Sequence, residues 1–426
     1  MFSLLRIDQT SLETLETQRL SSTTVMTVRL TAADIRRLDV SSLLDMYARD
    51  EGLFFNPHKL FKETGGGAYF FLTDDDKAIA PTFDGTLVVT DTGADAFTSV
   101  EIPIPGLEAG DVIAAVAPFW WARDHYWYVT KLAKVGIANL SGVQVEIDLR
   151  SIGETDERVN NSFAAGADGA FVVTSKAMYR LDVPEHIDLS DLDPAALVIW
   201  RSLYQNDETE KCGQLNAAAG TTPTLVGERF VAITDNSDRM NVVLYDRGSG
   251  ALVSEVEAFP EAPDGESACD NSLVSFGFSI FAGNTFCYKD PFVDNPQPRG
   301  GFSRINVDHR TETAAIAWSN ASIFGWSAVP KLSSSTGLIY IYSRELESPD
   351  GGAPRWYLRG IDQDGTVVMN AEIARRSRED WFDVYIRTLR IDHWDNGWGP
   401  LYLGPDAWGR PTVFASAIQG LIRMRF

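Results

Sequence analysis

The stretch GTTPTLVGERFVAITDNSDRMNVVLY, residues 220–245, decides the fold. It holds three short runs that are rich in β-branched and aromatic residues, a composition typical of strands. Turn residues separate the runs, first Gly227-Glu228 and then the segment DNSD at 235–238. A further turn, DRGSG at 246–250, leads into a fourth run. Short strands joined by Gly, Asp and Asn turns predict an antiparallel meander of four strands.

The same unit recurs along the chain. A short marker precedes one strand-like run in each copy, and we expect that run to be the second strand of the unit. The markers are Asp84-Gly85, Tyr126, Asp168-Gly169, Gly227, Gly277, Gly337 and Gly409. Four-stranded repeats of about 40–50 residues are typical of β-propellers. A set of separate β-sandwich domains is the alternative, but the repeats are continuous and no linker divides them.

We therefore predict an all-β protein, a seven-bladed β-propeller of four-stranded antiparallel blades over residues 66–426, with six or eight blades as alternatives. Residues 1–65 are expected to form a short, partly helical extension, with a strand at 23–30 and helices after Thr31. That strand or a nearby segment is expected to complete the last blade, because closure removes an exposed sheet edge. A helical interruption is also expected at 371–381.

Charge and cysteine content limit the function classes. The formal net charge is −22, which excludes nucleic acid and anionic membrane surfaces as partners because both need a basic footprint. No run has transmembrane length and no signal peptide is recognised, so we expect a soluble protein, either cytoplasmic or a mature secreted form. Its oligomeric state is left open. Cys212, Cys269 and Cys287 show no metal spacing; reduced thiols are expected, with a Cys269–Cys287 disulfide as the alternative.

Two segments resemble a known repeat. DGAFVVTSKAMYRLDV at 168–183 and TGLIYIYSRE at 336–345 are similar to the strand-turn-strand unit of the PQQ-repeat, or quinoprotein dehydrogenase-like, propellers. The resemblance covers roughly residues 70–426 and implies the fold. The family's quinone-binding pattern includes an adjacent cysteine pair, and this chain has none. The resemblance therefore carries over neither the quinone nor redox activity, and no cofactor is expected.

In a propeller the first strand of every blade lines the central channel. We therefore take as candidate site residues those that lie five to seven positions before each predicted second strand. Three successive repeats place polar pairs at matching positions, namely Asn161-Ser162, Thr221-Thr222 and Asn271-Ser272. Such residues either bind a ligand or satisfy backbone groups where strands converge. Lys331 is assigned to the same step of the next repeat, between apolar neighbours. A buried lysine there is expected to hold an anionic or carbonyl group.

Two classes of function remain. The first is a small-molecule enzyme or binder at the channel mouth, using non-redox acid-base chemistry (a hydrolase, lyase, isomerase or cyclase) on a partly apolar carbonyl or carboxylate compound. Lys331 is its expected catalytic group, with Asp235 or His125 as partner. An aromatic cover is expected from Trp120, Trp121, Trp394 and Trp398. The second class is a non-catalytic scaffold or protein-interaction propeller that uses its acidic surface and long loops.

Metal binding is a weaker hypothesis. The turn at 235–238 supplies Asp and Asn oxygens of the kind that calcium prefers. Its spacing does not match an EF-hand loop, and Asx-rich turns also form for backbone reasons alone. We therefore expect no metal.

Overall fold

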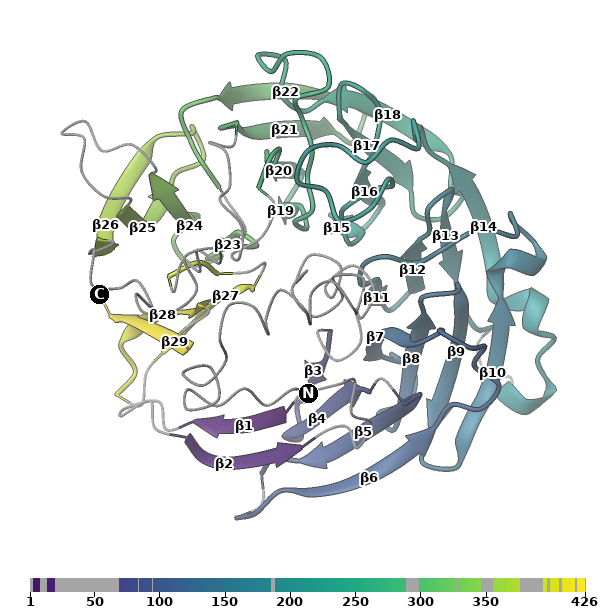
Figure 1. The fold of residues 1–426 in the computed structure, drawn as a ribbon. Helices are drawn as coiled ribbons and strands as arrows, with labels where there is room; N and C mark the ends of the chain where they lie inside the picture. Colours follow the sequence, from purple (N-terminus) through teal and green to yellow (C-terminus); the bar gives the residue numbers. More distant parts are fainter. Residues whose placement is uncertain are drawn as a thin grey trace, which may run out of the picture.

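The described residues form eight β-sheets, and seven of them are arranged as blades around one axis (Figure 1). The computed structural model describes residues 3–7, 14–19, 69–82, 84–93, 95–184, 188–288, 299–325, 328–345, 355–375, 394–396, 399–405, 408–417 and 420–425. Within these ranges the helical elements are three short 3-10 turns, η1 (Leu149–Ser151), η2 (Leu189–Asp191) and η3 (Pro194–Leu197). The predicted seven-bladed β-propeller is confirmed.

Each blade is an antiparallel meander whose strands follow one another from the axis outward. The strands of blades 1 to 3 are β3 (Phe71–Leu72), β4 (Lys77–Pro81), β5 (Thr86–Asp91), β6 (Thr98–Pro103), β7 (Ile113–Pro118), β8 (His125–Thr130), β9 (Lys134–Asn139), β10 (Gly142–Asp148), β11 (Ala164–Gly166), β12 (Gly169–Val173), β13 (Ala177–Leu181) and β14 (Val198–Leu203). Those of blades 4 and 5 are β15 (Thr224–Val226), β16 (Phe230–Thr234), β17 (Asn241–Asp246), β18 (Leu252–Glu257), β19 (Val274–Phe276), β20 (Ser279–Gly283), β21 (Phe302–Asp308) and β22 (Thr313–Asn320). Blade 6 has β23 (Lys331–Leu332), β24 (Ile339–Glu345), β25 (Arg355–Ile361) and β26 (Val367–Arg375), and the described strands of blade 7 are β27 (Leu401–Pro405), β28 (Pro411–Ala417) and β29 (Gly420–Arg425).

Burial explains the sequence pattern of the strands. Every residue of β16 is buried, whereas β18 at the outer edge of the same blade is partly exposed throughout. A middle strand of a blade is covered on both faces by the neighbouring blades, so it reads as a continuous apolar run and not as an alternating one. Gly227 makes the turn into β16 with a φ of +57°, and a Cβ there would come within 2.7 Å of the Phe278 ring. The turn between the first two strands of blade 4 therefore needs glycine.

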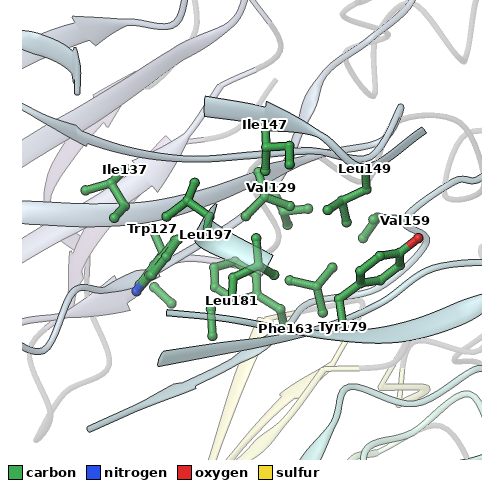
Figure 2. Close-up of a cluster of buried hydrophobic side chains, with 14 of the residues drawn as sticks. Trp127, Val129, Ile137, Ile147, Leu149, Val159, Phe163, Tyr179, Leu181 and Leu197 are labelled. Atoms are coloured by element: carbon green, nitrogen blue, oxygen red, sulfur yellow. The ribbon is translucent and has the colours of Figure 1, made fainter. Parts of the chain in front are cut away.

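The core lies between blades. Figure 2 shows the cluster between blades 2 and 3, where Trp127 from β8 and Ile137 from β9 lie near Leu181 from β13. Similar clusters join blade 3 to 4, 4 to 5, 5 to 6 and 6 to 7, and one joins blades 1 and 2. Because each of these sheets buries a face on the next one, the seven blades form one continuous unit, which accounts for a chain of this length as a single propeller.

The start of the chain forms a hairpin of β1 (Ser3–Ile7) and β2 (Thr14–Arg19). Arg6 fixes it to the loop after β5 by donating to the carbonyl oxygens of Thr92 at 3.0 Å and Asp95 at 2.9 Å. The strand expected at 23–30 and the helices expected after Thr31 lie outside the described residues, so the expected closure of the ring stays a prediction.

Three details of the expected fold are wrong. The marker Asp84-Gly85 precedes the third strand of blade 1, because β4 upstream is the second. The helix expected from residue 371 is replaced as far as Arg375 by β26, which pairs with β25. The expected thiol state is also corrected, since Cys212 and Cys287 form a disulfide and Cys269 is free and buried.

Candidate functional site

The propeller has two faces that differ in their connections. The upper face carries the turns between the second and third strands and the connections from one blade to the next. The lower face carries the first-to-second and third-to-fourth turns. We call the segments that lead into the innermost strands, on the upper face, the axial rim; it contains Tyr69, residues 160–162, 220–222 and 270–272.

The three polar pairs lie at this rim, two residues before β11, β15 and β19. Asn161 donates its side-chain amide to the carbonyl oxygen of Ala219, and Asn271 donates to Ala328, each at 3.4 Å. Thr221 is fully buried, and its hydroxyl accepts from the Thr234 backbone N–H at 2.9 Å. These first members join the rim to β16 and to the connections that enter blades 4 and 6. Ser162, Thr222 and Ser272, the second members, are half-buried.

Lys331 differs from the expectation in two ways. It is the first residue of β23 itself, opposite Tyr340, and does not precede the innermost strand as the polar pairs do. Its side chain is exposed. An exposed ammonium has no desolvation cost to offset, so the argument that a buried Lys331 needs an anion does not hold.

The two expected partners of Lys331 lie at opposite ends of their strands. Asp235 follows β16 on the upper face and is buried, with its carboxylate accepting from Ser237 Oγ at 2.8 Å and from Asn241 N at 2.7 Å. His125 begins β8 on the lower face, and its Nε2 lies 2.9 Å from Asn139 Nδ2. The Asp235 carboxylate therefore stabilises the turn that follows β16. The structure does not bring Lys331, Asp235 and His125 together.

The tryptophans are divided in the same way. Trp120 and Trp121 lie in the lower-face turn between β7 and β8, with exposed fractions of 65% and 51%. Trp394 lies in the upper-face connection before β27 and packs against the cluster between blades 6 and 7. Trp398 lies outside the described residues. Trp120 and Trp121 thus lie on the opposite face from Trp394, and these three described residues do not form one aromatic cover.

A site residue that the sequence argument missed is Asp270. It lies at the axial rim directly before Asn271 and is half-buried, and its carboxylate accepts from the Leu215 backbone N–H at 3.2 Å. Desolvation raises the pKa of this carboxyl to about 7, against the smaller lowering effect of the Leu215 N–H. Asn160 and Gly220 occupy the equivalent step of the two preceding repeats. Alignment of the three repeats would have singled out Asp270 as the ionisable residue.

Tyr69 is a second ionisable residue of the axial rim, in blade 1, and its side chain is partly exposed. It precedes β3, and β3 and β19 lie on opposite sides of the axis in Figure 1. Loss of hydration raises the pKa of the Tyr69 hydroxyl to about 12, with a second contribution from the charge of Asp270. The phenol thus stays protonated over the physiological range and is available as a donor near Asp270.

Residues 205–220, between blades 3 and 4, form a segment that we call the strap. Cys212 bonds it to Cys287 in blade 5, and Gln214 Nε2 donates to Asn236 Oδ1 at 3.0 Å. Lys211 donates to the carbonyl oxygens of Ser237, Asp238 and Ser267 in blade 4 and in the connection after it. The strap thereby holds the Leu215 N–H against Asp270.

Three further observations concern the described residues. A pocket of about 490 Å³ opens beside the strap, but its charged groups are engaged, Arg299 with Glu266 and Glu261 with Ser319. Within the described ranges, no group of three or more His, Cys, Asp or Glu side chains is placed to hold a metal ion. In the same part of the chain, no helix is long and apolar enough to cross a bilayer.

The fold places the chain in the class of β-propellers. No protein-family model and no curated protein matches the sequence. Similar solved structures include Saccharomyces cerevisiae Sqt1 (10% identity, covering 86% of this chain and 97% of that one, TM-score 0.50) and the WD40 propeller domain of Doa1 (10%, 85% and 93%, 0.46). BamB from Moraxella catarrhalis is another (13%, 84% and 98%, 0.40). At these identities the likeness shows the fold alone, and no specific quinoprotein is matched.

Proposed function

We propose that this propeller binds a small organic molecule at the axial rim and that Asp270 is its acid-base group. The observation that carries the proposal is the Asp270 carboxyl, placed at the rim with a pKa of about 7. A carboxyl in this state exists in both protonation forms near neutral pH, which is what general acid-base catalysis requires.

The neighbouring groups limit the chemistry. Tyr69 keeps its proton and is suited to donate a hydrogen bond to a carbonyl or carboxylate oxygen of the ligand. Proton transfer by Asp270 with donation by Tyr69 fits hydrolysis, elimination, isomerisation or cyclisation, and none of these needs a redox cofactor. Asp270 and Tyr69 thus replace Lys331, Asp235 and His125 as the proposed working residues.

Asp270→Asn and Tyr69→Phe test this proposal. A metabolite library is screened against the parent by thermal shift, and the affinity or turnover of each hit is then followed with pH. We expect the parent profile to change near pH 7, Asp270→Asn to lose that change, and Tyr69→Phe to weaken binding at every pH. Asp264→Asn is the matched control, since Asp264 is an exposed carboxylate paired with Arg239. An unaltered pH profile in Asp270→Asn would refute the assignment.

A second candidate function is protein binding through the lower face. Trp120 and Trp121 are adjacent, strongly exposed aromatic side chains, the residue type that dominates binding energy at interfaces. The net charge of −22 favours a partner with a basic rim around an apolar contact. Trp120→Ala with Trp121→Ala is expected to abolish capture of such a partner and to leave ligand binding at the rim unchanged. If this variant also lost ligand binding at the axial rim, the rim and the lower face would not be two independent binding surfaces.

The disulfide bears on where the protein works. Disulfides form and persist in oxidising compartments and are rare where thiols are kept reduced. We infer from Cys212–Cys287 that, of the two expected locations, the secreted form is favoured. Free-thiol labelling of the protein isolated from its native cells tests this, and three reactive cysteines after denaturation would contradict it.

A further inference from the structure

Lys131 is a half-buried cation whose role the fold does not explain. It follows β8 on the upper face, where its backbone N–H donates to Val112 O at 2.9 Å and its carbonyl accepts from Val159 N at 3.0 Å. These bonds fix the residue between the connections into blades 2 and 3. The side chain then reaches the axial rim, where Nζ donates to Asn160 O at 3.2 Å.

This ammonium lacks a carboxylate partner among the described residues. A lysine carries three N–H donors, and the backbone oxygen of Asn160 uses one of them. Lys211 on the same face provides the contrast, because its three donors meet three backbone carbonyls. Lys211 is thus explained as a brace of the strap, whereas Lys131 has donors to spare.

Asp111 and Glu157, the acids beside Val112 and Val159, do not pair with Lys131. Asp111 accepts from the Leu132 N–H at 2.9 Å, and the cation that lowers its pKa is Lys134. Glu157 is fully buried and accepts from Thr174, Tyr179 and Arg201. Desolvation, with no charged partner to oppose it, lowers the pKa of Lys131 to about 8.

The hydrogen bond to Asn160 places the Lys131 ammonium at the axial rim. Asn160 stands at the step of blade 3 that Asp270 occupies in blade 5, so the ammonium and the carboxyl belong to the same rim. We propose that Lys131 is the anion-binding group of the axial rim and holds an oxyanion of the ligand, a carboxylate or a phosphate. The proposal rests on the proposed function for the identity of the site. It gives Lys131 the role that the sequence suggested for Lys331.

The test uses the full chain with inorganic phosphate and with acetate as probes, each at millimolar concentration and constant ionic strength. We expect at least one probe to raise the melting temperature of the parent saturably, as a ligand that binds only the folded state must. Lys131→Met is expected to fold at least as stably without probe and to lose the effect. Lys176→Met, which removes a half-buried lysine paired with Asp156 and Glu208, is expected to keep it. The probe that acts distinguishes a phosphate ligand from a carboxylate one.

A second readout does not depend on melting. Amine labelling followed by mass spectrometry is expected to give half-maximal reactivity of Lys131 near pH 8, against about 10.4 for ordinary lysines. The active probe should slow the labelling of Lys131 and leave Lys176 unaffected. Equal probe effects in the parent and Lys131→Met, or no protection by either probe, would overturn the inference. Asp270 is assigned from a pH profile of ligand binding, so its assignment survives a failure at Lys131.

Discussion

At the scale of the residue, the Asp270 carboxyl links function to stability. Its folded pKa of about 7 lies above the ordinary value of about 3.9, so the folded protein holds a proton that the unfolded chain has lost between these pH values. The contribution of Asp270 to stability is therefore complete below about pH 4, falls as the pH rises to about 7, and is constant above that.

Asp270→Asn removes this slope. Urea unfolding at pH 5 and pH 8 is expected to show a smaller loss of stability with pH in the variant than in the parent. The variant should also be the more stable protein at pH 8, because no charge is desolvated there. The same pH dependence in both proteins would show that Asp270 titrates normally.

Glu157 is the residue whose loss should damage the fold most. Its fully buried carboxylate accepts from Thr174 Oγ1 at 2.6 Å, from Tyr179 Oη at 2.9 Å and from Arg201 Nη2 at 3.0 Å. Glu157→Ala leaves the Arg201 charge without its partner, and such changes cost about 3–5 kcal/mol. Asp156→Ala, one position away and exposed, should stay within about 0.5 kcal/mol in the same denaturation assay. Similar losses in the two variants would contradict this account.

At the scale of the element, the strap depends on its disulfide. Replacing Cys212 and Cys287 by serine is expected to cost about 2–5 kcal/mol, because the bond closes a long loop of the unfolded chain. The Leu215 N–H lowers the pKa of Asp270, so a strap that no longer holds it there should let that pKa rise further. Guanidinium unfolding and the pH profile of binding measure the two effects. Cys269→Ser is the control for the loss of a buried thiol.

The elements also show what the sequence could and could not predict. Middle strands such as β16 were predictable because burial on both faces demands an apolar run of strand length. In blade 1 the third strand was mistaken for the second, because β4 and β5 are both apolar runs. The sequence of such a run does not show how far the strand lies from the axis. The polar steps of the rim were found from their repeat spacing. Asp270, Lys131 and the disulfide were missed because their significance depends on contacts between blades, and sequence spacing does not encode these.

At the scale of the whole molecule, charge should govern the response to salt. With a net charge of −22, the excess acidic side chains repel one another in the folded state. Salt weakens this repulsion, because at 0.1 M charges more than about 10 Å apart are largely screened. The melting temperature should therefore rise between low and moderate sodium chloride, and solubility should be lowest near the isoelectric point of about 4.6. A melting temperature that falls with added salt would mean that attractive ion pairs outweigh the excess of acid.

The bond between the strap and blade 5 also orders the events of synthesis. Cys212 leaves the ribosome before any strand of blade 4, and its partner follows only after β20, 75 residues later. The native partner of Cys212 is therefore absent while blade 4 is synthesised. The native disulfide can form only after the nascent chain has reached Cys287 in the fifth blade. Nascent chains arrested before residue 287 should keep a reactive thiol at Cys212, and chains arrested well after it should have lost that thiol to the disulfide. The redox state of Cys212 thus reports how far synthesis and folding have advanced along the chain.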